Sequence, residues 1–245
     1  MQEYFVKYGE KSVYGRLYTP DSKGKSPLII LSHGYNGIGA DFERECESFA
    51  QNGIAAYALD FCGGSTRSKS SGASSDMSLM TEKEDLIAVV EHFSKLDFVD
   101  ADRIFLLGGS QGGIVTALAA AELGDRIRGI ILYFPAFCIP DNWRHRFNET
   151  GIPDTVDFWG LTLGKTFFTS MQDLYPFEII GAYKGPVIII QGDRDSIVLV
   201  DDSKKAASIY ERCELTVLEG EGHGFSPDGL TVAIDTSLNF IRKLI

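Results

Sequence analysis

The sequence contains five short runs of apolar residues that do not alternate with polar ones. A strand with one solvent-facing side alternates, so uninterrupted runs of this length are typical of strands covered on both faces, as in parallel sheets. Segments of helical length and spacing lie between them, at about 40–52, 78–96 and 112–124. This order predicts an α/β protein with a mostly parallel central sheet flanked by helices. The five runs are 27–33, 54–60, 103–109, 128–134 and 186–192.

Two segments near the start of the chain, EYFVKY and SVYGRLY, have a different pattern, because bulky and polar residues alternate in them. Gly9 lies between the two segments, where the chain can turn back on itself. We therefore expect an antiparallel hairpin at one edge of the sheet.

One interval of about 50 residues, 135–184, separates two strands that a single helix could have connected. It holds both tryptophans, Trp143 and Trp159, among an unusual number of aromatic residues for a chain that is 11% aromatic overall. We expect residues 1–134 and 185–245 to form the α/β core and residues 135–184 to form a small cap, or lid. Some of these rings would give the insertion its own core, and the others would line an apolar pocket.

The composition of the chain argues against some binding partners and indicates a cellular compartment. The chain has 245 residues, 44% of them apolar, and a formal net charge of −11, which opposes binding to nucleic acid or to an anionic membrane. Four scattered cysteines without a CxxC pair favour free thiols and give no cysteine metal site. The first residues lack the apolar segment of a signal peptide, and the longest apolar run is too short for a membrane span. We expect a cytoplasmic protein that does not insert into membranes.

The strongest chemical motif is GxSxG, formed by Gly108, Ser110 and Gly112. It lies between the apolar run RIFLLGG and the helical segment IVTALAAAE, so it predicts a strand, a tight turn and a helix. Such a turn needs small residues because neighbouring backbone comes close, and it exposes the serine at the N-terminus of a helix. Ser110 is therefore our candidate nucleophile.

A serine hydroxyl needs a base to remove its proton, and the chain has four histidines. His92 falls on an amphipathic helix, and His145 lies in the cap between two arginines. His33 is the last residue of the first apolar run and is expected to form hydrogen bonds within the loop that begins there. His223 lies in the glycine-rich segment EGEGHGF, before the last helix, and is our candidate base.

A carboxylate should orient that histidine and stabilise its charged form. Two aspartates follow the last apolar run, in the segment QGDRDSIV. Asp193 is expected to shape the turn, and Asp195 is our candidate for the acid. An oxyanion hole needs two backbone N–H donors. Gln111, directly after the nucleophile, and Tyr35, just past Gly34 in HGYNG, are the candidates.

The motifs HGYNG, GGSQGG, GDRDSIV and EGHGF together resemble the α/β-hydrolase superfamily, in which the serine, the acid and the histidine follow in this order. The cap segment IPDTVDFWGLTLGKTFF resembles that of bacterial feruloyl (cinnamoyl) esterases. The resemblance implies a catalytic triad of Ser110, Asp195 and His223. It also implies that a polar cap residue binds the phenolic hydroxyl of the acid, with Asp141 as a counterpart beside Trp143 and Trp159.

These inferences favour a serine esterase that cleaves hydroxycinnamoyl esters through an acyl-enzyme, with a small-molecule ester as partner and with no metal or cofactor. A general short-chain carboxylesterase or a monoacylglycerol lipase would need the same triad and a different pocket. A non-catalytic ligand receptor on this fold would tend to lose triad members, whereas all three are present. The sequence leaves open whether the protein is a homodimer.

Overall fold

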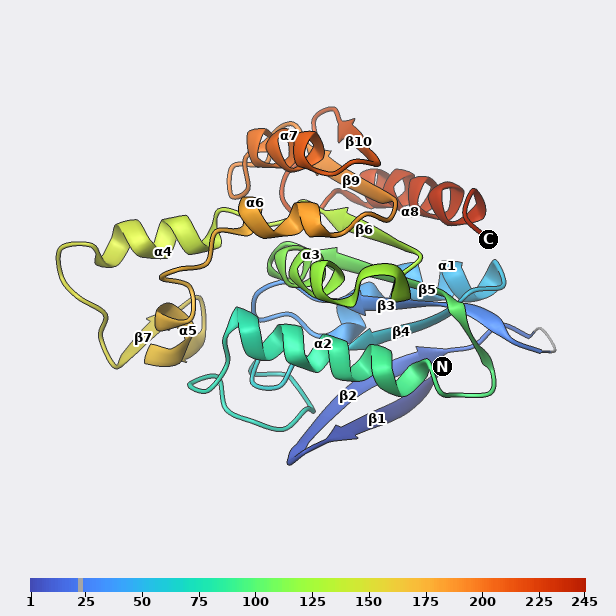
Figure 1. Cartoon of the computed structure of the whole chain (residues 1–245), viewed down its shortest axis with the longest axis horizontal. Helices are drawn as coiled ribbons and strands as arrows, with labels where there is room; N and C mark the ends of the chain where they lie inside the picture. Colours follow the sequence, from blue (N-terminus) through green and yellow to red (C-terminus); the bar gives the residue numbers. More distant parts are fainter. Residues whose placement is uncertain (22–23) are drawn as a thin grey trace.

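A central sheet of eight strands organises the computed structural model, which describes residues 1–21 and 24–245 (Figure 1). The strand order is β1-β2-β4-β3-β5-β6-β9-β10. The first two strands form the predicted antiparallel hairpin at one edge, and β2 joins β4 antiparallel, whereas all the other neighbours are parallel. The strands are β1 (Gln2–Tyr8), β2 (Lys11–Tyr18), β3 (Ser26–Ser32), β4 (Ala55–Leu59), β5 (Val99–Gly109), β6 (Gly129–Tyr133), β9 (Val187–Gly192) and β10 (Cys213–Leu218).

Helices cover both faces of the sheet, as the lack of alternation in the apolar runs predicts. Every residue of β3, β4, β6 and β9 is buried. One face packs against α2 (Leu79–Phe93), α3 (Gln111–Leu123) and α7 (Val200–Ile209). The other face packs against α1 (Glu43–Gln51) and α8 (Pro227–Arg242). The connections also contain two short 3-10 helices, η1 (Gly39–Phe42) and η2 (Gly124–Arg126). The predicted α/β class is confirmed.

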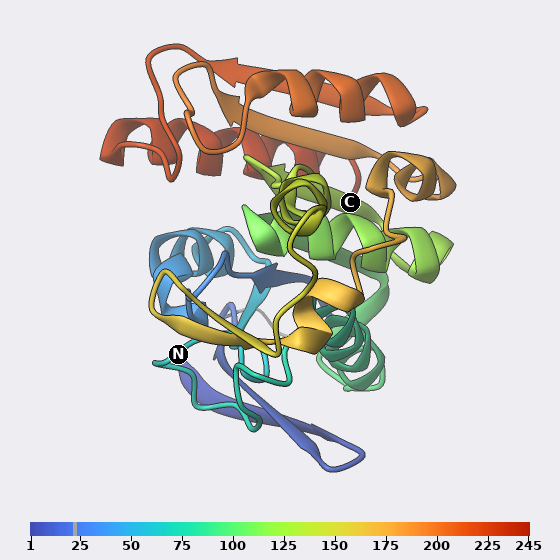
Figure 2. The ribbon, with the colours of Figure 1, turned by 90° about the vertical axis from the view of Figure 1, so that its left-hand side faces the viewer.

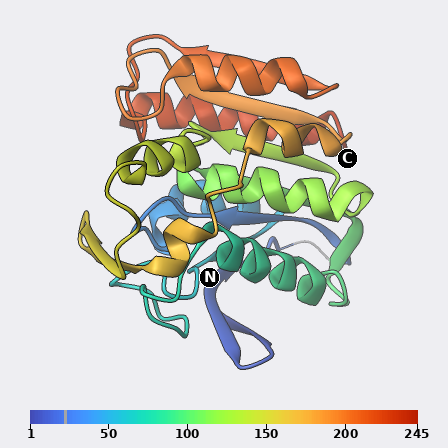
Figure 3. The same cartoon turned by 60° about the vertical axis from the view of Figure 1, so that its left-hand side comes forward.

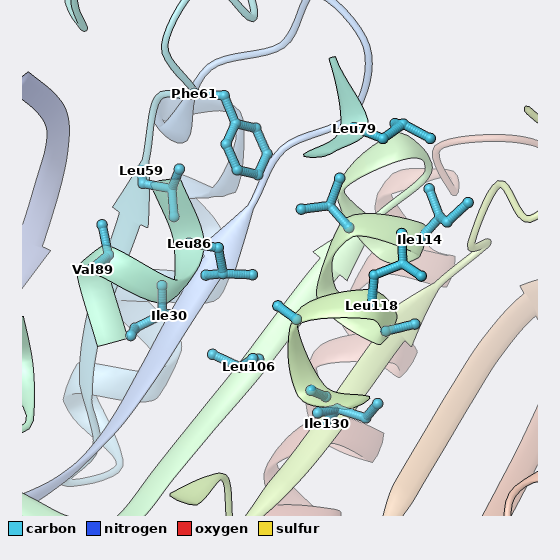
Figure 4. Close-up of a cluster of buried hydrophobic side chains, with 14 of the residues drawn as sticks. Ile30, Leu59, Phe61, Leu79, Leu86, Val89, Leu106, Ile114, Leu118 and Ile130 are labelled. Carbon is cyan, nitrogen blue, oxygen red and sulfur yellow. The ribbon is translucent and has the colours of Figure 1, made fainter. Parts of the chain in front are cut away.

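The larger core lies where α2 and α3 cross the middle strands (Figure 4). Leu106 of β5 is fully buried there, with Ile30 on one neighbouring strand and Ile130 on the other. Leu86 of α2 and Leu118 of α3 belong to the same cluster. This packing fixes the direction of β5, and β5 leads directly to the candidate nucleophile.

The interval expected to form the cap extends beyond one end of the sheet (Figures 1 and 3). Figure 2, which views this end, shows its yellow segments in front of the sheet. The interval contains α4 (Ile139–Phe147), the small antiparallel pair β7 (Thr155–Phe158) and β8 (Leu161–Gly164), α5 (Lys165–Thr169), α6 (Pro176–Ile179) and η3 (Ile180–Ala182). The last two pack against α3 and α7 of the expected core. We therefore propose that the cap ends before α6, earlier than residue 184.

In the part of the chain that the structure describes, no helix is both long enough and apolar enough to cross a bilayer.

Replacing Leu106 by alanine should destabilise the protein strongly, because the close packing around β5 leaves little room for collapse into the vacated space. We expect Leu106→Ala to lower the free energy of unfolding by about 2–5 kcal/mol in a urea titration. Leu199→Ala is the matched control, since Leu199 is 61% exposed and the same change there removes little buried surface. Equal losses from the two variants would contradict this account of the core.

Candidate active site

Ser110 occupies a sharp turn between β5 and α3. Its backbone has φ 53° and ψ −118°, a left-handed conformation that is strained for a residue with a side chain. The turn is possible because the flanking glycines allow backbone to approach closely. A Cβ atom on Gly112 would lie 2.2 Å from the Ser32 carbonyl oxygen, and one on Gly108 would lie 2.2 Å from the Gly112 carbonyl oxygen. The first turn of α3 is thus pressed against the sheet, with Ser110 at its N-terminus.

His223 lies against the serine hydroxyl. Its Nε2 atom is 3.0 Å from Ser110 Oγ, and its Nδ1 atom is 2.8 Å from Asp195 Oδ2. The ring of Phe134 packs on the imidazole, with centroids 4.7 Å apart, and Phe225 packs on Phe134 in turn. The histidine therefore has a hydrogen-bonding partner at each nitrogen and an aromatic ring on its side.

Asp195 is held as an ionised group that points at the histidine. Its side chain is fully buried, and Oδ1 accepts hydrogen bonds of 2.9 Å from the backbone N–H groups of Ile197 and Val198. The Gln191 amide donates to Oδ2 at 3.1 Å, beside His223. Burial alone raises the pKa of Asp195, but the backbone and histidine hydrogen bonds together outweigh burial and leave this pKa below its ordinary value.

The other candidates lie elsewhere. Asp193 is exposed and accepts a hydrogen bond of 2.7 Å from the Gly220 N–H, so it links the loop after β9 to the loop after β10. His33 is buried, with Nδ1 2.7 Å from the Gly34 oxygen and Nε2 accepting from the Phe61 N–H. His92 bonds the Tyr4 hydroxyl at 2.8 Å, and His145 is exposed.

The two expected oxyanion donors flank the serine. Gln111 is the first residue of α3, where a backbone N–H has no acceptor within the helix. Gly34, which precedes Tyr35, lies so close that its Cβ would be 3.1 Å from Ser110 Cβ. The Tyr35 hydroxyl donates to the Phe158 carbonyl oxygen at 2.6 Å, and the Asn36 amide donates to the Trp159 carbonyl oxygen at 3.2 Å. These bonds connect the loop after β3 with the β7–β8 hairpin of the expected cap.

A cavity of about 170 Å³ opens from Ser110 into the cap. Five aromatic residues contribute to its walls, and both tryptophans, Trp143 and Trp159, are among them. The ring of Trp159 stacks on Phe158 at 4.7 Å, and Trp143 meets Phe158 edge-on. The lining residues are Tyr35, Ser110, Gln111, Ala136, Cys138, Ile139, Asn142, Trp143, Arg146, Phe158, Trp159, Phe167, Ile197 and Val198.

Asp141 does not line this cavity, contrary to the expectation that it would reach the substrate. Its carboxylate pairs with Arg144 one helical turn away. The polar cap residues that do line the cavity are Asn142 and Arg146, which the sequence reasoning missed. A helical signal was available, because Ile139, Asn142 and Arg146 follow the spacing of one helix face together with Trp143.

Residues that could hold a metal ion are not grouped in the described chain, where no three histidine, cysteine, aspartate or glutamate side chains converge.

Comparisons with known proteins identify the family and the fold of the chain. The model of the prolyl oligopeptidase family matches residues 40–245. The chain belongs to this family. Family and fold make the protein a serine hydrolase of the α/β-hydrolase type, and the predicted α/β-hydrolase resemblance is confirmed.

The same fold appears in solved structures along nearly the whole chain. Est1E from Butyrivibrio proteoclasticus with bound ferulic acid is 27% identical, with a TM-score of 0.90 and 98% of each chain covered. A monoacylglycerol lipase from Paleococcus ferrophilus has a TM-score of 0.73 at 16% identity, over 95% of this chain and 99% of the lipase, and shows the fold alone.

A curated relative matches part of the chain. It is an uncharacterised 31.7 kDa protein of Escherichia coli from the traX–finO intergenic region, 32% identical over 114 residues. The match covers 46% of this chain and 38% of the relative, so the chain spans well under half of that protein's length.

The two aspartates of the QGDRDSIV loop provide a test of the geometry. Asp195→Asn should lower kcat roughly a thousandfold or more with little change in KM, because an amide cannot stabilise the imidazolium or fix its tautomer. Asp193→Asn is the matched control, and it should keep kcat within about threefold because Asp193 bonds the Gly220 N–H and not His223. Comparable kcat values for the two variants in an ester-hydrolysis assay would exclude Asp195 as the partner of His223.

Proposed function

We propose that this enzyme hydrolyses carboxylic esters of hydroxycinnamic (feruloyl-type) acids through an acyl-enzyme on Ser110. The observation that carries the proposal is the aromatic cavity that opens directly from the serine hydroxyl. Flat walls from Trp143, Phe158 and Trp159 suit a planar acyl group. At about 170 Å³ the cavity is smaller than a typical pocket for a drug-sized ligand, so it suits an acyl group with one ring.

The residues around Ser110 take the following roles in this proposal. His223 removes the hydroxyl proton while Oγ attacks the ester carbonyl carbon, and Asp195 stabilises the resulting imidazolium. The Gln111 and Tyr35 backbone N–H groups donate to the oxyanion. Collapse of the tetrahedral intermediate expels the alcohol, which takes the proton from His223. Water then attacks the acyl-enzyme, His223 accepts a proton from that water and returns it to Ser110, and the free acid leaves.

The similarity to Est1E with bound ferulic acid supports the same acyl class, because the two proteins align along 98% of each chain. Cleavage of aliphatic esters alone would instead favour a general short-chain carboxylesterase or a monoacylglycerol lipase. Binding of ferulate without turnover of any ester would favour a receptor.

Ser110→Ala is the direct test of the nucleophile. The rate of methyl ferulate hydrolysis, measured as the release of ferulate, should fall at least about a thousandfold, because no acyl-enzyme can form. The variant should keep the wild-type unfolding temperature or exceed it slightly, since alanine loses no core contact and the chain otherwise stays unchanged. Activity within tenfold of the wild type would contradict the assignment of Ser110.

The acyl preference is tested with two esters of the same alcohol, methyl ferulate and methyl butyrate. We expect kcat/KM to be at least about tenfold higher for the ferulate, because additional apolar contact between substrate and pocket raises kcat/KM by about this factor. Trp159→Ala should reduce this preference several-fold, since Trp159 stacks at the cavity and is 64% exposed, so its loss costs little stability.

Tyr175→Ala is the matched control, because Tyr175 is an exposed aromatic residue outside the cavity. It should leave the ratio of the two kcat/KM values unchanged. A wild-type enzyme that prefers the butyrate would contradict the feruloyl-type assignment and leave ester hydrolysis standing.

A further inference from the structure

A buried carboxylic acid lies beside the candidate oxyanion donor. Glu82 of α2 is 1% exposed, and its Oε2 atom accepts a hydrogen bond of 2.8 Å from the side-chain amide of Gln111. Its other oxygen, Oε1, has no hydrogen-bond partner among the residues that the structure describes. The proposed mechanism uses only the backbone of Gln111, so it leaves this contact unexplained.

Among the residues that the structure describes, no cation contributes to the electrostatic surroundings of Glu82. On its own helix, Asp85 acts on Glu82 through its negative charge, and the ammonium group of Lys11 pairs with Asp85 at 3.2 Å. In the loop after β3, burial raises the pKa of the Tyr35 hydroxyl, and the charge of Glu82 adds to this shift. His33 comes close as well, since a Cβ atom on Gly64 would lie 3.2 Å from both Glu82 Oε1 and His33 Cε1.

The nearby imidazole does not neutralise the acid either. His33 Nε2 accepts the Phe61 N–H, so that nitrogen carries no proton, and burial lowers the pKa of His33. From α3, Gln111 presents only a neutral amide. An ionised Glu82 would therefore be a buried charge without a counterion, which is unfavourable.

The protonation state of Glu82 follows from this environment. Burial raises the pKa of Glu82 to about 8, the hydrogen bond from Gln111 opposes the shift, and the charge of Asp85 adds to it. Glu82 is thus neutral at pH 7 and becomes ionised above about pH 8.

We propose that Glu82 is a positioning residue for the oxyanion donor: it anchors the side chain of Gln111, and its ionisation lowers the rate at alkaline pH. This inference rests on the proposed function, because it assumes that the Gln111 N–H binds the oxyanion. Negative charge develops on the substrate oxygen in the transition state, and a second buried negative charge behind Gln111 opposes it. Glu82 exchanges no proton with the substrate.

The pH profile of kcat tests the proposal. With methyl ferulate, the wild type should lose activity above about pH 8, as Glu82 ionises. Glu82→Gln cannot ionise, so it should lose this alkaline limb. The kcat ratio of variant to wild type should rise from about one at pH 7 to about tenfold at pH 9, one unit above the pKa.

Glu84→Gln is the matched control, since it makes the same chemical change two residues along α2 at an exposed position. Its pH profile should coincide with that of the wild type. KM should change little in either variant, because Glu82 acts on the transition state.

A readout without turnover checks the protonation itself. Because the folded-state pKa of Glu82 lies above its unfolded value, the folded protein holds an extra proton between about pH 4.3 and 8. Glu82 therefore makes the free energy of unfolding fall as pH rises through this window. Glu82→Gln should remove that part of the slope, and Glu84→Gln should not.

Should Glu82→Gln fail to fold, Gln111→Leu tests the same point. It keeps the backbone N–H but removes the amide whose hydrogen bond lowers the pKa of Glu82. The alkaline limb should then move to higher pH, and an unmoved limb would overturn the proposal.

The two proposals fail separately. An alkaline limb that persists unchanged in folded Glu82→Gln, with Ser110→Ala inactive, overturns the role of Glu82 and leaves the esterase mechanism intact. Full activity in Ser110→Ala overturns the mechanism and, with it, the role of Glu82.

Discussion

The close contact between the first turn of α3 and the backbone of β3 and β5 is the constraint on which the structure depends. It exists because Gly108 and Gly112 have no side chains, so carbonyl groups lie where Cβ atoms would otherwise stand. The contact holds α3 close to the sheet, where its apolar residues pack in the larger core. It also holds Ser110 in its strained conformation and points the helix N-terminus toward the cavity. The packing of α3 on the sheet and the position of the candidate nucleophile thus have one physical origin.

The sequence predicts the parts that this contact organises. Strands buried on both faces need continuous apolar side chains, so their positions are visible as apolar runs, and the turn at Ser110 needs glycines at fixed spacing. Asp195 and His223 were predictable because each follows a strand whose carboxyl end meets the same edge as that of β5. The structure brings these side chains together with Ser110.

The cap and the buried acid were harder to predict. Asp141 and Arg146 are both plausible polar residues on one short helix, and only the rotation of α4 against the core decides which of them reaches the cavity. Glu82 occupies a position in the buried stripe of α2, between Leu79 and Leu86, where apolar periodicity leads one to expect a leucine. Glutamate is usually exposed, so the pattern of apolar residues does not predict that Glu82 is buried. Its hydrogen-bond partner, Gln111, lies on another helix and gives no local sequence signal.

The hydrogen bonds from Tyr35 and Asn36 to the carbonyl oxygens of Phe158 and Trp159 join the loop that follows β3 to the β7–β8 hairpin. Because the acceptors are backbone atoms, substitutions in the hairpin can change the cavity walls while the two bonds remain. Deleting or shortening the hairpin, by contrast, removes the acceptors themselves. New acyl specificities are therefore accessible by changing side chains within this hairpin, whereas transplanting a differently shaped cap would require rebuilding the loop that follows β3.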